Sequence, residues 1–305
     1  MWAGTIDRPG ARERVPAPAA PPAPGAWRTR GSGMAAAGVQ PASAPIPGPE
    51  LPAVPGRHPA LPSPPPSLAE LGHIADSAPV GWRFTPGSHP STIRNAHYGN
   101  TRAQLAYALQ HAYNSVEGDV RVRDGRAVMQ HDPHGRADLT FAQWATTMAR
   151  AGRHLRIDVK EHAAIGEITN TLEQLGVPGG SVTFNVGIDM PWSSGFQVDE
   201  VRQLRDRFPG CWITLNLPVP LGPGYVLASR AAREIGGDHL GVAVMAGLVH
   251  RSDIEYLRRS FDVVNVWNVP GLLGVDPERD APKLRAMGAN GMLDLRRADD
   301  PLAKP

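Results

Sequence analysis

The chain has 305 residues, 41% of them hydrophobic and 6% aromatic, and 31 lysines and arginines stand against 29 aspartates and glutamates. By length it is one large domain or two ordinary ones. A formal charge of +2, with no block of basic residues, gives no electrostatic case for nucleic-acid binding. The single cysteine, Cys211, excludes a disulfide framework and a thiolate zinc cluster.

No apolar run approaches the roughly 18 residues that a membrane span needs. Charged residues also interrupt the place near the N-terminus where the core of a signal peptide would lie. These features predict a cytoplasmic protein without a membrane span. The sequence leaves the oligomeric state open.

Proline is concentrated near the N-terminus, where residues 1–70 hold 17 of the 32 prolines. Stretches such as PAPAAPPAP and PSPPPS offer little apolar surface to offset the entropy that folding costs. We therefore predict a disordered Pro/Ala/Gly-rich tail over 1–78, a folded domain over 79–299 and a short C-terminal tail over 300–305.

From about residue 80 onwards, short apolar runs alternate with helical stretches. The predicted main strands are 91–97, 115–122, 154–160, 181–188, 211–219, 240–248, 262–269 and 291–295, and a hairpin strand is predicted at 127–131. The predicted helices are 101–113, 139–151, 163–175, 197–207, 224–235, 252–259 and 277–287. Asp138 is the expected N-cap of the helix at 139–151.

Strands that alternate with helices indicate a parallel sheet of the α/β class. Eight repeats in about 225 residues predict a closed (β/α)8 TIM barrel. An open doubly wound sheet fits less well, because the first strand ends in AHYGNT and lacks the glycine-rich phosphate loop of such folds.

Polar residues gather where the reactive groups of such barrels lie, at the C-terminal ends of the strands. Residues two apart on a strand share a face, so Glu117 and Asp119 should project together. The same spacing holds for Asp158 and Lys160. Other candidates at these ends are His97, His131, Asp132, Asn185, Asn216, Asn265, Trp267 and Asp294.

Three carboxylates that converge repel one another unless a cation lies among them. Because hard oxygen ligands suit Mg²⁺ or Ca²⁺, we predict that Glu117, Asp119 and Asp158 bind one divalent cation. Taken singly, an acidic pair or a D-x-K pair on a strand is usually an exposed feature of small energetic value. Their joint occurrence on neighbouring strands of one barrel favours a functional site.

The order of these motifs resembles the phospholipase-C-like phosphodiesterase superfamily, which includes the glycerophosphodiester phosphodiesterases and sphingomyelinase D. The menorin family is a closer resemblance. It is carried by AHYGN, VEGDV, MQH, ADLTFAQW and LRIDVK, and continues in FPGCWITLNLPV and VNVWNV, so that it covers about residues 90–297.

This resemblance implies a metal-dependent phosphodiesterase that acts on a small-molecule phosphodiester. His97 and His131 would be the general base and acid pair, and Lys160 would bind a phosphate oxygen. Two imidazoles, a metal ion and a lysine meet the proton and charge requirements of phosphodiester cleavage. The candidate substrate contacts are Asn100, Asn185, Asn216 and Trp267.

One position departs from the glycerophosphodiester enzymes, which follow the first histidine with arginine, whereas this chain has Tyr98. The loss of a bidentate phosphate donor favours an alternative, an inactive barrel that retains metal and binds a phosphorylated ligand or a protein partner. His134 is a second candidate for the role of His131. An isomerase or aldolase with Lys160 as a Schiff-base amine is less favoured, because Asp158 would keep that amine protonated.

Overall fold

The computed structural model describes residues 59–189, 195–217 and 222–303. Its strands are β1 Asn95–Ala96, β2 Ser115–Arg123, β3 Arg126–Met129, β4 His154–Val159, β5 Val182–Gly187, β6 Trp212–Asn216, β7 Leu240–Met245, β8 Val263–Trp267 and β9 Leu293–Asp294. Its α-helices are α1 Leu68–Asp76, α2 Arg102–Gln110, α3 Phe141–Ala151, α4 Ile165–Gln174, α5 Val198–Arg207, α6 Gly222–Ile235, α7 Arg251–Leu257 and α8 Pro277–Ala286. None of the helices in these ranges is long and apolar enough to cross a membrane.

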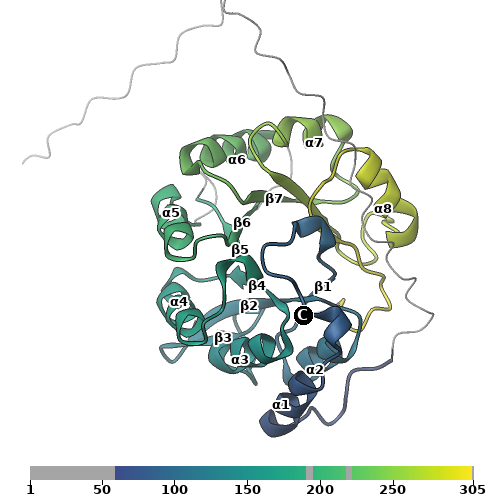
Figure 1. Cartoon of the computed structure of the whole chain (residues 1–305). Coiled ribbons are helices and arrows are strands. Elements are labelled where there is room, and N and C mark those ends of the chain that lie inside the picture. The colour runs from purple at the N-terminus through teal and green to yellow at the C-terminus, as the bar shows by residue number, and fades with distance from the viewer. Residues whose placement is uncertain (1–58, 190–194, 218–221, 304–305) are drawn as a thin grey trace, which may run out of the picture. The chain divides into compact units, whose positions relative to one another are not determined.

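The main strands form one parallel sheet in the order β1-β2-β4-β5-β6-β7-β8-β9, and β3 pairs antiparallel with β2. Helices surround this sheet (Figure 1). The predicted eight strands, the hairpin strand and the (β/α)8 class are confirmed, with a barrel that is nearly closed. The predicted strand 91–97 is reduced to β1, because Pro90–Thr92 forms a 3-10 helix, and residues 218–219 of the predicted strand 211–219 lie outside the described residues. The sheet order runs from β1 to β9, and side chains cross the seam between them, where Asn95 Nδ2 donates to Asp294 Oδ2 over 3.2 Å.

Alternation along β2, β4 and β5 divides their side chains into an apolar and a polar set. Val116, Ile157 and Phe184 are fully buried in the apolar core cluster. The alternate residues form layers in register across β2, β4 and β5: Ser115 with His154, then Glu117 with Arg156 and Thr183, then Asp119 with Asp158 and Asn185. Because successive strand residues face opposite sides, the polar set lines the inside of the barrel while the apolar set packs outside the sheet.

The helix α3 begins at a capping box rather than at the predicted cap Asp138. Thr140 is the N-cap, and its side chain accepts a hydrogen bond from Gln143 N. Asp138 instead accepts a hydrogen bond from Arg102 N, in the first turn of α2, at 3.2 Å. The prediction was wrong because Thr140 caps α3, and Asp138, two residues before it, binds an otherwise unsatisfied N–H in the first turn of α2.

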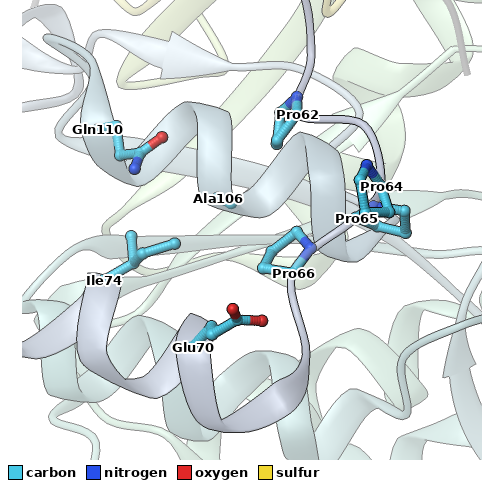
Figure 2. Close-up of a pocket in the computed structure, with 8 residues that line it drawn as sticks. All are labelled: Pro62, Pro64, Pro65, Pro66, Glu70, Ile74, Ala106 and Gln110. Carbon is cyan, nitrogen blue, oxygen red and sulfur yellow. The ribbon is translucent and has the colours of Figure 1, made fainter.

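The predicted tail over 1–78 is wrong in its last part, where α1 is folded. Ser67 and Glu70 form a capping box, and Leu71 lies fully buried within the core cluster. The prolines before this helix line a cavity of about 200 Å³ with residues of α1 and α2 (Figure 2). Local composition missed this helix because its burial depends on contact with α2 and α3. Residues 1–58 of the predicted tail lie outside the described residues.

The predicted C-terminal tail over 300–305 is also packed where it is described. Leu302 is fully buried, and its carbonyl accepts a hydrogen bond of 2.8 Å from Arg296 Nη1. Residues 304–305 lie outside the described residues. The folded domain therefore extends beyond the predicted bounds of 79–299 at both ends.

His154 is a fully buried histidine of the lowest polar layer. Its Nδ1 lies 2.9 Å from Ser115 Oγ, and its Nε2 lies 3.0 Å from Thr183 Oγ1. Burial, reinforced by Arg156, lowers the pKa of His154 to about 3. In the unfolded chain an imidazole titrates near pH 6.5, so between these values the unfolded state binds one proton more than the native state.

This difference predicts that acid weakens the fold through His154. Stability falls by about 1.4 kcal/mol per pH unit below pH 6.5, which amounts to about 3 kcal/mol at pH 4. Urea unfolding of wild type and of His154→Gln, repeated from pH 7 to pH 4, measures this contribution. The gap between the two unfolding free energies should shrink by about that amount. His73 is exposed, so His73→Gln serves as the control. If the unfolding free energies of wild type and His154→Gln changed in parallel with pH, the contribution assigned to His154 would be refuted.

Candidate active site

Three buried carboxylates of β2 and β4 lie close together inside the barrel. Oxygen atoms of Glu117, Asp119 and Asp158 all lie within 4.8 Å of one another, and each residue is at most 5% exposed. Asp119 and Asp158 are partners in the parallel register of the two strands, which sets them side by side. The structure thus brings together the three predicted metal ligands, and this cluster could hold a metal ion.

Lys160 places its ammonium between two of these carboxylates. Its Nζ lies 2.9 Å from Asp119 Oδ1 and 2.7 Å from Asp158 Oδ2. Burial disfavours the ammonium, yet Asp158 and Asp119 outweigh it and raise the pKa of Lys160. Lys160 is therefore a cation throughout the neutral range, and a Schiff-base role is not favoured.

The two carboxylates that share Lys160 titrate differently. Burial disfavours ionised Asp119, but Lys160 and the amide of Asn100 hold its pKa below the usual range. Burial raises the pKa of Asp158 despite its contact with Lys160. The neighbouring carboxylates of Asp119 and Glu117 also raise the pKa of Asp158. Asn100 binds Asp119 with both ends of its side chain: Nδ2 donates to Asp119 Oδ2 over 2.6 Å, and Oδ1 accepts from Asp119 N over 2.8 Å.

Glu117 has polar partners within the barrel. Arg156 Nε donates to Glu117 Oε2 over 2.8 Å, and both side chains are almost completely buried. Asn95 Nδ2 also donates to Glu117 Oε2, over 3.2 Å. This carboxylate is therefore held in one position by an ion pair and an amide.

His97 follows β1 and lies against two carboxylates. Its Nδ1 is 2.6 Å from Asp294 Oδ2 and 3.3 Å from Glu117 Oε2. Burial favours the neutral imidazole, but the Glu117 and Asp294 carboxylates outweigh it and raise the pKa of His97. Burial would raise the pKa of Asp294, yet His97 and Arg296 hold it well below its usual range. The contact with Asp294 thus favours the imidazolium form of His97.

His131 lies beyond β3, and its side chain is about one third exposed. Its Nδ1 is 2.9 Å from Asp132 Oδ1, and its carbonyl accepts a hydrogen bond of 2.8 Å from Arg121 Nε. The ring of Tyr98 contacts both predicted catalytic imidazoles, with centroids 4.2 Å from His97 and 5.1 Å from His131. His134 is exposed in the following loop.

The remaining predicted contacts lie on other strands of the barrel. Asn185 is in register with Asp158, and its Oδ1 is a buried oxygen without a hydrogen-bond partner among the described residues. Asn216 ends β6, two residues beyond the inward Thr214. Trp267 ends β8, in register with Asp294.

Sequence reasoning assigned no role to three residues that complete the site, Asn95, Arg156 and Asp294. The spacing of two that paired Glu117 with Asp119 also places Asn95 on the face of His97, and Arg156 on the face of Asp158. Asp294 was recognised at a strand end, but its partner His97 lies 197 residues away in the sequence. Only closure of the barrel brings these two side chains together.

Residues 90–204 match the Menorin N-terminal domain. The match supports the menorin-like resemblance that the motifs indicated. The matched segment runs from the turn before β1 into α5, so it contains His97, Glu117, Asp119, His131, Asp158 and Lys160. Asn216, Trp267 and Asp294 lie beyond the menorin-like segment. No curated protein matches the sequence.

The chain is also similar to several solved structures at low identity. A candidate glycerophosphodiester phosphodiesterase from Galdieria sulphuraria is 15% identical, covers 70% of this chain and 95% of its own, and gives a TM-score of 0.47. 2,3-Dimethylmalate lyase is 15% identical, covers 77% of this chain and 78% of its own, and gives a TM-score of 0.42. 3-Dehydroquinate dehydratase from Geobacillus kaustophilus HTA426 is 14% identical, covers 67% of this chain and 80% of its own, and gives a TM-score of 0.39.

Proposed function

We propose that the chain is a divalent-metal-dependent phosphodiesterase of the phospholipase-C-like kind, a hydrolase or a lyase, with a two-histidine acid–base pair. The observation that carries the proposal is the convergence of the Glu117, Asp119 and Asp158 carboxylates within 4.8 Å, beside His97. The Menorin N-terminal domain match supports it, because the matched segment spans all these residues.

Glu117, Asp119 and Asp158 would hold one Mg²⁺ or Ca²⁺ ion. Their donor set of hard oxygens fits such an ion, and the unpartnered Asn185 Oδ1 on the next strand adds a further buried oxygen. When bound, the cation supplies positive charge against the negative charge that develops on the phosphate. Asn100 keeps Asp119 oriented by bonding both its carboxylate and its backbone N–H.

His97 would act as the general acid. Its raised pKa favours the protonated ring, and Asp294 binds Nδ1, so Nε2 would be the atom that donates a proton to the departing ester oxygen. His131 would act as the base. With Nδ1 directed to Asp132, its Nε2 accepts the proton of the attacking hydroxyl.

In this reaction one P–O bond forms to the attacking oxygen while the bond to the leaving alcohol breaks. The attacking oxygen loses its proton to His131, and the leaving oxygen gains one from His97. Water as the attacking group gives a phosphomonoester, whereas a hydroxyl of the substrate gives a cyclic phosphate. Lys160 would bring its positive charge to a phosphate oxygen, and Asn185, Asn216 and Trp267 would contact the substrate.

A phosphodiester panel tests this function. Each diester is incubated with the protein and Mg²⁺, Ca²⁺ or Mn²⁺, and ³¹P NMR separates a monoester product from a cyclic phosphate. We expect one of the two products from at least one diester, and its loss on addition of EDTA. Product formation that EDTA does not affect would contradict a metal-dependent reaction.

The rival is a barrel that retains the metal and binds a phosphorylated ligand or a protein partner without catalysis. Tyr98 favours it, because the phenol contacts both imidazoles where a substrate would need access to them. Binding of diesters in the presence of metal, with no product from any member of the panel, would support the rival over the enzyme.

A further inference from the structure

Tyr98 holds its backbone in a conformation that its side chain disfavours. Its φ of +55° lies in the left-handed region, where a bulky L-residue is an outlier that costs stability. The chain passes close to β2 at the next residue, Gly99, since a Cβ there would lie 2.2 Å from Val116 Cγ1 and 3.2 Å from Glu117 O. A glycine at position 98 would adopt this φ without strain.

The phenol occupies the space that both imidazoles border. Its ring stands nearly perpendicular to the His97 ring and to the His131 ring, at centroid distances of 4.2 and 5.1 Å. On the same ring, the guanidinium carbon of Arg296 lies 5.3 Å from the centroid. Two rings and a cation therefore fix the Tyr98 side chain at the site.

Strain that is retained at a functional site points to a role for the strained residue. Any ligand whose two ester oxygens must reach His97 and His131 has to pass the phenol that touches both rings. An aromatic ester group requires the volume that this ring fills, whereas a slender alkyl group requires much less.

We propose that Tyr98 is a specificity-determining residue that selects phosphodiesters with slender alkyl groups and rejects those with two bulky aryl groups. This inference rests on the proposed phosphodiesterase function. In this inference, tyrosine in place of arginine at this position narrows the choice of substrate and does not inactivate the site.

Two chromogenic diesters test the selection, methyl p-nitrophenyl phosphate and bis(p-nitrophenyl) phosphate. Both release p-nitrophenolate and differ in the group that stays on phosphorus. Wild type should prefer the methyl ester in kcat/KM, and Tyr98→Ala should reduce that preference by about tenfold, the effect of a lost steric contact of this size. Tyr98→Phe keeps the ring and should keep the wild-type ratio. An unchanged ratio in Tyr98→Ala would overturn the proposal.

A binding measurement keeps this test separate from the proposed function. The diester panel decides the proposed function. If wild type hydrolyses neither of these two diesters, selection is measured by calorimetry with inorganic phosphate and phenyl phosphate. Wild type should favour inorganic phosphate, and Tyr98→Ala should reduce the preference by about tenfold. Equal preference in the two proteins would refute the steric role of Tyr98.

The strain itself is tested by Tyr98→Gly against Tyr98→Ala. Both variants lose the same ring contacts, but only alanine retains a Cβ at positive φ. The Tm of the glycine variant should be about 2–4 °C above that of the alanine variant. A glycine variant that melts at the same temperature or lower would remove the strain argument and overturn the inference drawn from it.

Discussion

Replacement of His97 by alanine is expected to lower the turnover of a phosphodiester by about two orders of magnitude or more, the usual effect of a lost general acid. The residue is placed for that role by Asp294, whose Oδ2 lies 2.6 Å from Nδ1. His131→Ala should lose a similar factor, because each imidazole handles a different proton. The measurement is kcat/KM for the best diester of the panel, at saturating metal.

The exposed His73 on α1 provides the control for these two variants. His73→Ala should keep wild-type turnover. Wild-type rates in both His97→Ala and His131→Ala would reject the acid–base assignment, even if the protein proves to be a phosphodiesterase.

Glu117→Gln is expected to destabilise the fold by about 3–5 kcal/mol, since it leaves a buried arginine without its counter-charge. Arg156 is 5% exposed, and its Nε lies 2.8 Å from Glu117 Oε2. Urea unfolding at pH 7 without metal measures the loss, so that any effect on cation binding does not contribute.

A double variant separates the ion pair from general damage. Glu117→Leu combined with Arg156→Met removes both charges and should recover most of the stability lost in Glu117→Gln. A Glu117→Gln variant within about 0.5 kcal/mol of wild type, the range of an ordinary surface change, would show that the pair does not support the barrel.

The fold was predictable because a single physical pattern repeats along the chain. Strand residues alternate between apolar and polar, as in β2 and β4, so the number and order of the main strands were predicted correctly. The exceptions depend on long-range contacts. The burial of α1 depends on its contacts with α2 and α3. Asp138 accepts a hydrogen bond from Arg102 N, in a helix that begins 36 residues before it.

Spacing within a strand predicted which site residues share a face, whereas the contacts between strands depend on how the strands pair. Glu117 and Asp119 were found by the spacing of two, and so were Asp158 and Lys160. The spacing could not show that Lys160 would lie on two carboxylates, because its contact with Asp119 depends on the register of β2 and β4. For the same reason Asp294 had no role until β9 was placed beside β1.

The most direct test of the account is a calorimetric titration of Mg²⁺ and Ca²⁺ into wild type and into Asp119→Asn with Asp158→Asn. These changes keep side-chain size but remove two of the three converging charges. The control pair, Asp199→Asn with Glu278→Gln, alters two carboxylates that are about 80% exposed. The account predicts one bound cation in wild type and in the control, and none in the site variant. Equal binding by all three proteins would contradict it.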